Sequence, residues 1–402
     1  MNLHRRRRGL AAMAGLVAVA AVMSLGAAGP AQLVLRQATA EELLGPTGAD
    51  QAEWFCDGLA GVGARASLYD QALADLAALT APDGALVAAA APAAWAYVWP
   101  RDAAFGAAAL AVSGHFDQAS AVLGFLQQVQ GADGRFEARY HQDGTPVDDG
   151  RPAQLDGTGW ALWAYGQVMG AAPADRQAQV AAQFEPLVTR SADAIEQALA
   201  GGWQGLVSSD YWERRETIIT LGTVAPLRAG ALAIGRTDLV AGLDQVLAAY
   251  FQPFGYPRYA KGSDLDAAAA MLAPAFQGEW PGGAATAGLA AERALARPAG
   301  GLAPGEGWRR DGVSWTPETA LFAYAWASAG QAERAESWLT WLDQHRTDQG
   351  SLSEKVLADG SPAGPAPLSW TAALVVLAGA SLGELAPASE VAVTCQPGEA
   401  GQ

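Results

Sequence analysis

Cysteine, histidine and lysine are scarce in this chain of 402 residues. There are two cysteines and four histidines, scattered along the sequence, so a zinc site has almost no support and we predict neither a metal nor a cofactor. Arginine supplies nearly all of the positive charge, because Lys261 and Lys355 are the only lysines. The net charge of −16 excludes nucleic acid and anionic lipid as partners, and we expect a neutral ligand such as a sugar.

Long apolar runs are also missing, except at the N-terminus. Arg5 to Arg8 precede a run of small and apolar residues from Gly9 to Ala28, and small residues follow near position 31. This arrangement is typical of a secretory signal, which we place at residues 1–31, although the run is also long enough for an uncleaved membrane anchor. We therefore expect the protein to be secreted or extracytoplasmic, and to meet a membrane only through this segment.

The two cysteines stand at opposite ends of the remaining chain. Cys56 and Cys395 flank nearly all of the predicted folded region, which we place at 50–395. In an oxidising compartment, an even cysteine count favours a disulfide that joins the two ends. Two unpaired thiols are the alternative.

Helical periodicity dominates the folded region, while alternation of polar and apolar residues is rare. This pattern predicts an all-α protein. The twelve expected helices lie near 66–80, 102–113, 115–130, 157–169, 174–200, 217–234, 236–250, 264–274, 282–297, 316–329, 331–347 and 367–382.

The connections between these helices alternate between short and long. Four of them are short turns with a glycine where a C′ residue ends a helix, namely Gly114, Gly170, Gly235 and Gly330. The connections after the first, third, fifth, seventh, ninth and eleventh helices are long and rich in Gly, Pro, Trp and charged residues. Twelve helices with this alternation form six hairpins whose long loops gather on one side. We therefore predict an (α/α)6 barrel, in one domain and as a monomer. A helical solenoid is the alternative, but no residue signature repeats at a fixed period.

The residues that can carry chemistry fall in the long loops, where binding and catalysis concentrate. The loops contain "WAYVWPRD" at 95–102, "DDGRPAQLDGTGW" at 148–160, "SSDYWERRE" at 208–216, "GWRRDGVSWTPE" at 307–318 and "GSLSEK" at 350–355. By the alternation of the connections, all of them meet at one mouth of the barrel. Glu213 and Glu354 should therefore face the same pocket.

A pair of carboxyl groups on either side of a sugar is what cleavage of a glycosidic bond requires. One protonates the leaving oxygen, and the other activates water for inversion or attacks the sugar for retention. The acid needs an apolar or anionic neighbourhood to keep its proton. Trp212 is next to Glu213, and Asp210 is three positions away, whereas Glu354 stands among small polar residues. From chemistry alone, either glutamate is more often an ordinary surface residue.

Arg101 and Asp102 follow Trp99 and Pro100 at the start of a helix. The aspartate is suited to the helix dipole, and the pair is equally suited to binding sugar hydroxyls. Several of the fourteen tryptophans lie in or beside the same long loops, where their faces can pack on pyranose rings or on the protein core.

Taken together, these motifs resemble those of glycoside hydrolase family 15, the glucoamylase family, over roughly residues 95 to 385. The resemblance rests on "YVWPRD", "GRPAQLDG", "DYWERRE" and "GSLSEK" with "PLSW", in this order. It implies an (α/α)6 barrel that releases β-glucose by inversion from non-reducing chain ends, with Glu213 as general acid and Glu354 as general base. The substrate-binding residues that we expect from these motifs are Trp95, Trp99, Arg101, Asp102, Asp156, Asp210, Tyr211, Trp212, Arg310 and Trp370.

The sequence also departs from the family pattern. The segment "WRRDGVSWTPE" is shorter than its family counterpart, which leaves Arg309 as an alternative to Arg310. The loop at 131–150 has Arg139, Tyr140 and His141 in place of a tryptophan, and Lys355 replaces a usual glutamine. We expect a short α-1,4- or α-1,6-linked gluco-oligosaccharide rather than starch. The alternatives are a trehalase or another glycosidase with this fold, and a sugar-binding protein without catalysis.

Overall fold

The computed structural model describes residues 67–90, 95–262 and 264–385. The predicted signal at 1–31 and both cysteines lie outside these ranges. No helix of the described residues is long and apolar enough to span a membrane.

Six helical segments with almost completely buried side chains form an inner ring. Each contacts the next, and the last contacts the first, which closes the ring. The segments are α4 (Pro100–Val112), α6 (Asp156–Ala171), α10 (Leu221–Ala233), the 3-10 helix η2 (Ala267–Leu272) with α12 (Pro274–Gln277), α14 (Thr316–Ser328) and α16 (Ser369–Leu382).

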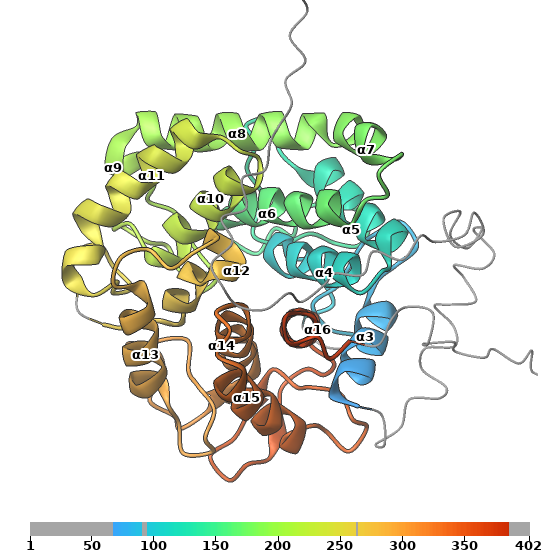
Figure 1. The fold of residues 1–402 in the computed structure, drawn as a ribbon, viewed down its shortest axis with the longest axis vertical. Helices are drawn as coiled ribbons and strands as arrows, with labels where there is room; N and C mark the ends of the chain where they lie inside the picture. Colours follow the sequence, from blue (N-terminus) through green and yellow to red (C-terminus); the bar gives the residue numbers. More distant parts are fainter. Residues whose placement is uncertain (1–66, 91–94, 263, 386–402) are drawn as a thin grey trace, which may run out of the picture. The chain divides into compact units, whose positions relative to one another are not determined.

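The outer helices alternate with the inner ones along the chain and surround them in Figure 1. They bury one face and expose the other, as a partly apolar helix does at the edge of a core. These helices are α3 (Leu68–Leu79), α5 (Phe116–Val129), α7 (Gln177–Gln183) with α8 (Glu185–Ala200), α11 (Thr237–Tyr250), α13 (Ala284–Leu295) and α15 (Ala332–Gln344). The all-α prediction of six hairpins in a barrel is confirmed, and the solenoid is wrong because the ring closes.

Small residues let the inner helices approach one another closely. A Cβ at Gly159 on α6 would lie 2.3 Å from the backbone of Pro226 on α10, and one at Gly230 would lie 2.5 Å from the carbonyl oxygen of Gly159. These two positions require glycine, and the buried alanines along the ring fill the other contacts.

The short turns agree with the prediction at three of the four glycines. Gly114, Gly235 and Gly330 have φ of 87°, 70° and 70°, the left-handed conformation that ends a helix. Gly170 was wrongly predicted as such a residue: it lies inside α6, which continues to Ala171. Two predicted helices are also divided. Segment 174–200 contains α7 and α8, with Pro186 in the first turn of α8. Segment 264–274 contains the 3-10 helix η2, and α12 begins only at its last residue, Pro274.

Little strand structure is present in the described residues. Besides isolated bridges there are β1 (Ser314–Trp315), β2 (Lys355–Val356) and β3 (Pro362–Ala363), which form an antiparallel sheet in the order β1-β2-β3. The short helices α9 (Gly202–Gly205) and η1 (Gln252–Phe254) complete the elements. Because Lys355 pairs with Trp315, this sheet fixes the segment after Glu354 against the entry to α14.

Candidate active site

A pocket of about 460 Å³ opens at the end of the barrel where the long loops meet. This volume lies within the range of ~300–1,000 Å³ that is usual for small-molecule sites. Its wall comes from the segments that precede α4, α6, α10, α14 and α16, as the alternation of the connections predicts. Six tryptophans line it: Trp95, Trp99, Trp212, Trp308, Trp315 and Trp370.

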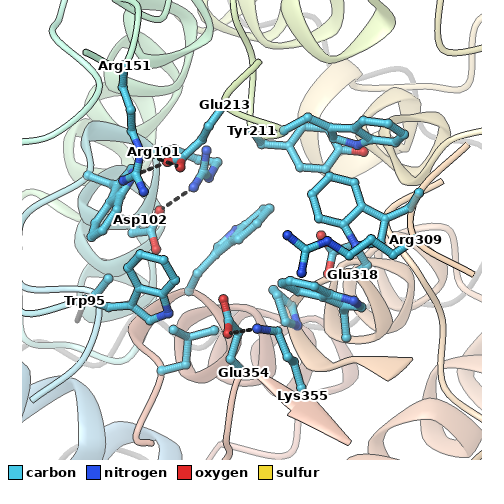
Figure 2. Close-up of a pocket in the computed structure, with 18 residues that line it drawn as sticks. Trp95, Arg101, Asp102, Arg151, Tyr211, Glu213, Arg309, Glu318, Glu354 and Lys355 are labelled. Carbon is cyan, nitrogen blue, oxygen red and sulfur yellow. Dashed lines mark hydrogen bonds and ion pairs between the residues drawn. The ribbon is translucent and has the colours of Figure 1, made fainter. Parts of the chain in front are cut away.

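Glu213 and Glu354 both line this pocket, from opposite sides of the open space in Figure 2. They belong to loops that are far apart in the sequence. The expectation that the two carboxyl groups share one pocket is therefore confirmed.

Glu213 ends a tight turn that the sequence "DYWE" forms. Its backbone N–H donates to the carbonyl oxygen of Asp210 at 2.7 Å, and its φ is +55°. A left-handed glutamate is uncommon, and such backbone strain concentrates at functional sites. The side chain accepts a hydrogen bond from Trp99 Nε1, and Arg151 Nε lies 3.2 Å from its other oxygen.

Glu354 is held by backbone contacts on both sides. Its N–H donates to Pro365 at 3.0 Å, and its carbonyl oxygen accepts from the N–H of Thr316 at 3.1 Å. Behind this loop, the Ser351 hydroxyl donates to Asp75 on α3 at 2.8 Å. The Lys355 ammonium lies 2.7 Å from a carboxylate oxygen of Glu354 and 4.4 Å from the ring of Trp315.

Arg101 and Asp102 start α4 and lie in the wall of the pocket, where Pro100 occupies the first helical position. Arg101 pairs with Asp102 at 2.9 Å and stacks over Trp370 at 4.5 Å. Burial raises the pKa of Asp102, although the guanidinium of Arg101 opposes the shift.

Two aspartates that we expected in the pocket lie behind it. Asp210 is completely buried, its Oδ1 pairs with Arg258 at 2.9 Å, and it does not line the pocket. Asp156 is 1% exposed and is not among the pocket-lining residues. Burial raises its pKa to about 7, against the effect of the nearby Arg101.

Arg258 is the centre of a buried network that the sequence did not reveal. It pairs with Asp210, Glu216 at 2.8 Å and Asp266 at 3.2 Å, and its guanidinium packs 3.7 Å above Trp212. The Tyr211 hydroxyl donates to Asp266, and burial raises the pKa of Tyr211. The network thus fixes Tyr211 and Trp212, which line the pocket as predicted.

Of the two adjacent arginines in the 307–318 loop, Arg309 lines the pocket. Arg310, which we expected to bind substrate there, instead lies at a separate hollow with Arg297 and Glu306. The loop at 131–150 does not reach the pocket wall either. Arg139 is buried beneath Tyr97 and Trp99, at 4.4 and 4.9 Å from their rings.

Sequence reasoning did not assign a place in the pocket to three polar residues that line it, Arg151, Glu318 and Lys355. Glu318, in the first turn of α14, is 3% exposed. Burial raises its pKa to about 8, and the charge of Glu354 adds to the shift. Its position resembled that of an ordinary helix-start acid, so only its burial distinguishes it. Arg151 was visible in the motif "GRPAQLDG", whose arginine we left without a role.

Within the described residues, no group of three or more His, Cys, Asp or Glu side chains is arranged to hold a metal ion. The polar groups of the pocket are carboxyl, guanidinium, ammonium and hydroxyl groups surrounded by indole rings. This set can bind a hydroxyl-rich ligand and transfer protons to and from it.

The chain shares its fold with glycosidases of known structure. No family model matches the sequence, and no curated protein matches it either. The structure of a wild-type glycosidase superposes with a TM-score of 0.68 at 19% identity, over 85% of this chain and 100% of that one.

Two glucoamylases show the same relationship. A bacterial glucoamylase complexed with acarbose gives a TM-score of 0.62 at 18% identity, over 80% of this chain and 56% of that one. The glucoamylase of Saccharomycopsis fibuligera gives 0.58 at 13% identity, over 84% and 96%. At such identities the likeness shows the six-hairpin barrel alone.

Proposed function

We propose that this protein is a glycoside hydrolase of the glucoamylase type that releases β-glucose by inversion from the non-reducing ends of short α-gluco-oligosaccharides. The observation that carries this proposal is that Glu213 and Glu354, from two distant loops, line the same tryptophan-rich pocket. The resemblance of four ordered motifs to glycoside hydrolase family 15 supports it, as does the shared fold.

In this proposal Glu213 is the general acid. Its proton passes to the glycosidic oxygen as the bond to C1 breaks, and the alcohol leaves. Glu354 takes a proton from a water molecule, whose oxygen attacks C1 from the opposite face, so that the anomeric configuration inverts. Trp99 and Arg151 orient Glu213 through their contacts with its two oxygens, and Lys355 contacts Glu354.

Arg101 and Asp102 would hold hydroxyl groups of the glucose unit that is released. Their ion pair lies in the wall of the pocket beside Trp370, whose ring faces the guanidinium. The indole rings around the pocket suit the C–H faces of a pyranose. A pocket admits the end of an oligosaccharide chain rather than its middle, which supports cleavage from the chain end. We also propose that the protein acts outside the cytoplasm, with its N-terminal segment as a signal or anchor.

The test is hydrolysis of maltose, isomaltose, trehalose and short dextrans, with the first-formed anomer followed by NMR. We expect β-glucose from maltose or isomaltose. Glu213→Gln and Glu354→Gln should each reduce kcat by about 10²- to 10⁴-fold, the usual contribution of general acid–base catalysis.

Three other outcomes are informative. If α-glucose appears first, the inverting mechanism is wrong. Preferred cleavage of trehalose would identify the enzyme as a trehalase. Binding of a sugar without turnover would show that the pocket belongs to a binding protein.

A further inference from the structure

The pocket brings several cationic side chains together in an otherwise acidic protein. The net charge of the chain is −16, yet four cationic side chains line this one pocket, Arg101, Arg151, Arg309 and Lys355. Four carboxyl groups also line it, those of Asp102, Glu213, Glu318 and Glu354. The formal charges of the lining residues therefore cancel, but only if every carboxyl group is ionised.

Not every carboxyl group contributes a full negative charge. Glu318 is almost completely buried, and its pKa of about 8 leaves it protonated at neutral pH. Asp102 is matched by Arg101 in a close ion pair. Of the three remaining cations, Arg151 lies within ion-pair distance of Glu213 and Asp149, and Lys355 of Glu354, which leaves Arg309.

Two of these three cations have a local task. Arg151 contacts Glu213, and Lys355 contacts Glu354, so each orients one of the two candidate catalytic groups. Arg309 has no such task. Among the described residues, no carboxylate forms an ion pair with Arg309, and its guanidinium lies 6.0 Å from the ring of Trp308. In Figure 2 the side chain of Arg309 reaches into the open space of the pocket.

A second arginine lies beside the same tryptophan. The guanidinium of Arg214 is 4.7 Å from the ring of Trp212 and 5.2 Å from that of Trp308. It is exposed and forms no ion pair with the described residues. Guanidinium groups on aromatic faces are held in place with their donors free, and they bind carboxylate and phosphate oxygens in a bidentate way.

We propose that the leaving-group side of the pocket, around Arg309, binds an anionic group of the substrate, so that the preferred substrate is an α-glucoside whose leaving alcohol carries a carboxylate or a phosphate. This inference rests on the proposed glycosidase function and sharpens it. The overall acidity led us to expect a neutral ligand, and this expectation still holds for the glucose unit that is released. The charges at the mouth of the pocket, rather than the net charge of the chain, set the preference for the leaving group. Salt screens the interaction of the substrate with a charge inside the pocket less than its interaction with charges on the distant surface.

The test compares leaving groups that differ only in charge. Maltobionate and maltitol both carry an open-chain leaving group, and they differ by a carboxylate in place of a CH₂OH group. Isomaltobionate and isomaltitol form the same pair for the other linkage. Glucosylglycerol phosphate and glucosylglycerol test a phosphate. We expect kcat/KM to be about tenfold higher for the anionic member of a pair, the gain of one hydrogen bond to a charged group, and to decrease as NaCl is added.

Two variants locate the effect. Arg309→Gln should remove most of the preference for the anionic member. Arg310→Gln, which changes the adjacent exposed arginine at the separate hollow, should keep the ratio. If both variants retain the preference, Arg309 is not the recognition residue and the inference is wrong.

The two proposals fail in different ways. Equal kcat/KM values within each pair, with hydrolysis intact, would overturn the inference and leave the glycosidase function standing. If no α-glucoside is hydrolysed, the proposed function fails, and calorimetry with maltobionate and maltitol still decides the inference: tighter binding of maltobionate supports it, and equal binding rejects it. A preference confined to the phosphate pair would assign the anion as a phosphate.

Discussion

Two groups of charged residues lie side by side in this barrel, and they differ in how their charges are compensated. Around Arg258, three carboxylates bind one guanidinium that is 1% exposed. Around the pocket, Arg309 has no carboxylate partner and Glu318 has no cation in contact, among the described residues. Charges that are compensated by one another in the interior, as around Arg258, indicate a structural task. Arg309 is exposed at the pocket without a carboxylate partner, so its guanidinium is available to a ligand.

The largest expected effect tests this contrast directly. Arg258→Met leaves Asp210, Glu216 and Asp266 without their common partner, and we expect it to lower the free energy of unfolding by about 3–5 kcal/mol. Arg101→Met, whose arginine forms a single ion pair, should cost less stability and mainly reduce kcat/KM. Urea unfolding and steady-state kinetics measure the two effects. Equal losses of stability in both variants would remove the distinction between the groups.

The second effect concerns Glu318, the protonated acid of the pocket. Its pKa rises from 4.5 to about 8 on folding, so the folded chain holds a proton that the unfolded chain releases. Its contribution to stability is full below pH 4.5 and is lost as the pH rises toward 8 and beyond. Between pH 5 and pH 9, the Tm of Glu318→Gln should therefore decrease less than the Tm of the wild type.

Thermal unfolding in a series of buffers measures this difference. The matched control is Glu333→Gln, which changes an exposed acid in the first turn of α15 and should keep the pH dependence of the wild type. An unchanged slope in Glu318→Gln would show that Glu318 is ionised in the folded protein.

The third effect concerns the backbone that presents the general acid. Glu213 has φ of +55°, a conformation that costs a residue with a side chain roughly 1–2 kcal/mol and costs glycine almost nothing. The free energy of unfolding, measured with urea, should therefore be about 1 kcal/mol higher for Glu213→Gly than for Glu213→Ala. Neither variant should be active. The comparison uses two inactive variants, so lost activity does not confound it. Equal stability would mean that the turn relaxes when the side chain is removed.

The smallest effect concerns the support behind Glu354. Ser351→Ala removes a hydrogen bond to the buried Asp75, at a cost of about 1 kcal/mol in the free energy of unfolding. A lower kcat is also expected, because this contact ties the "GSLSE" loop to α3. Ser361→Ala, whose hydroxyl contacts an exposed aspartate, is the control and should change neither quantity. A loss of stability without a change in kcat would limit Ser351 to a structural task.

The sequence was most informative where a pattern repeats. Helical spacing in the folded region and the alternation of short and long connections predicted the closed barrel, with the long loops at one end. The positions of Glu213 and Glu354 followed from this layout without any knowledge of distances. The prediction of a helix end at Gly170 failed, because a glycine near the end of a helix does not by itself determine where the last helical hydrogen bond forms.

The assignment of individual polar residues was less certain. Asp210 and Arg309 show why: a motif gives the order of residues, whereas the direction of each side chain depends on what packs behind it. Asp210 points to Arg258, which is supplied by a distant loop, and Arg309 enters the pocket in place of its neighbour.

By itself, the sequence determined the all-α class, the six hairpins and the set of loops that carries the polar and aromatic residues, because these depend on periodicity and on turn residues that are local in the chain. Only the tertiary structure decided which charges are compensated. Burial and long-range pairing are properties of the folded barrel, and they made Glu318 a weak acid, closed the network of Arg258 and left Arg309 at the mouth of the pocket.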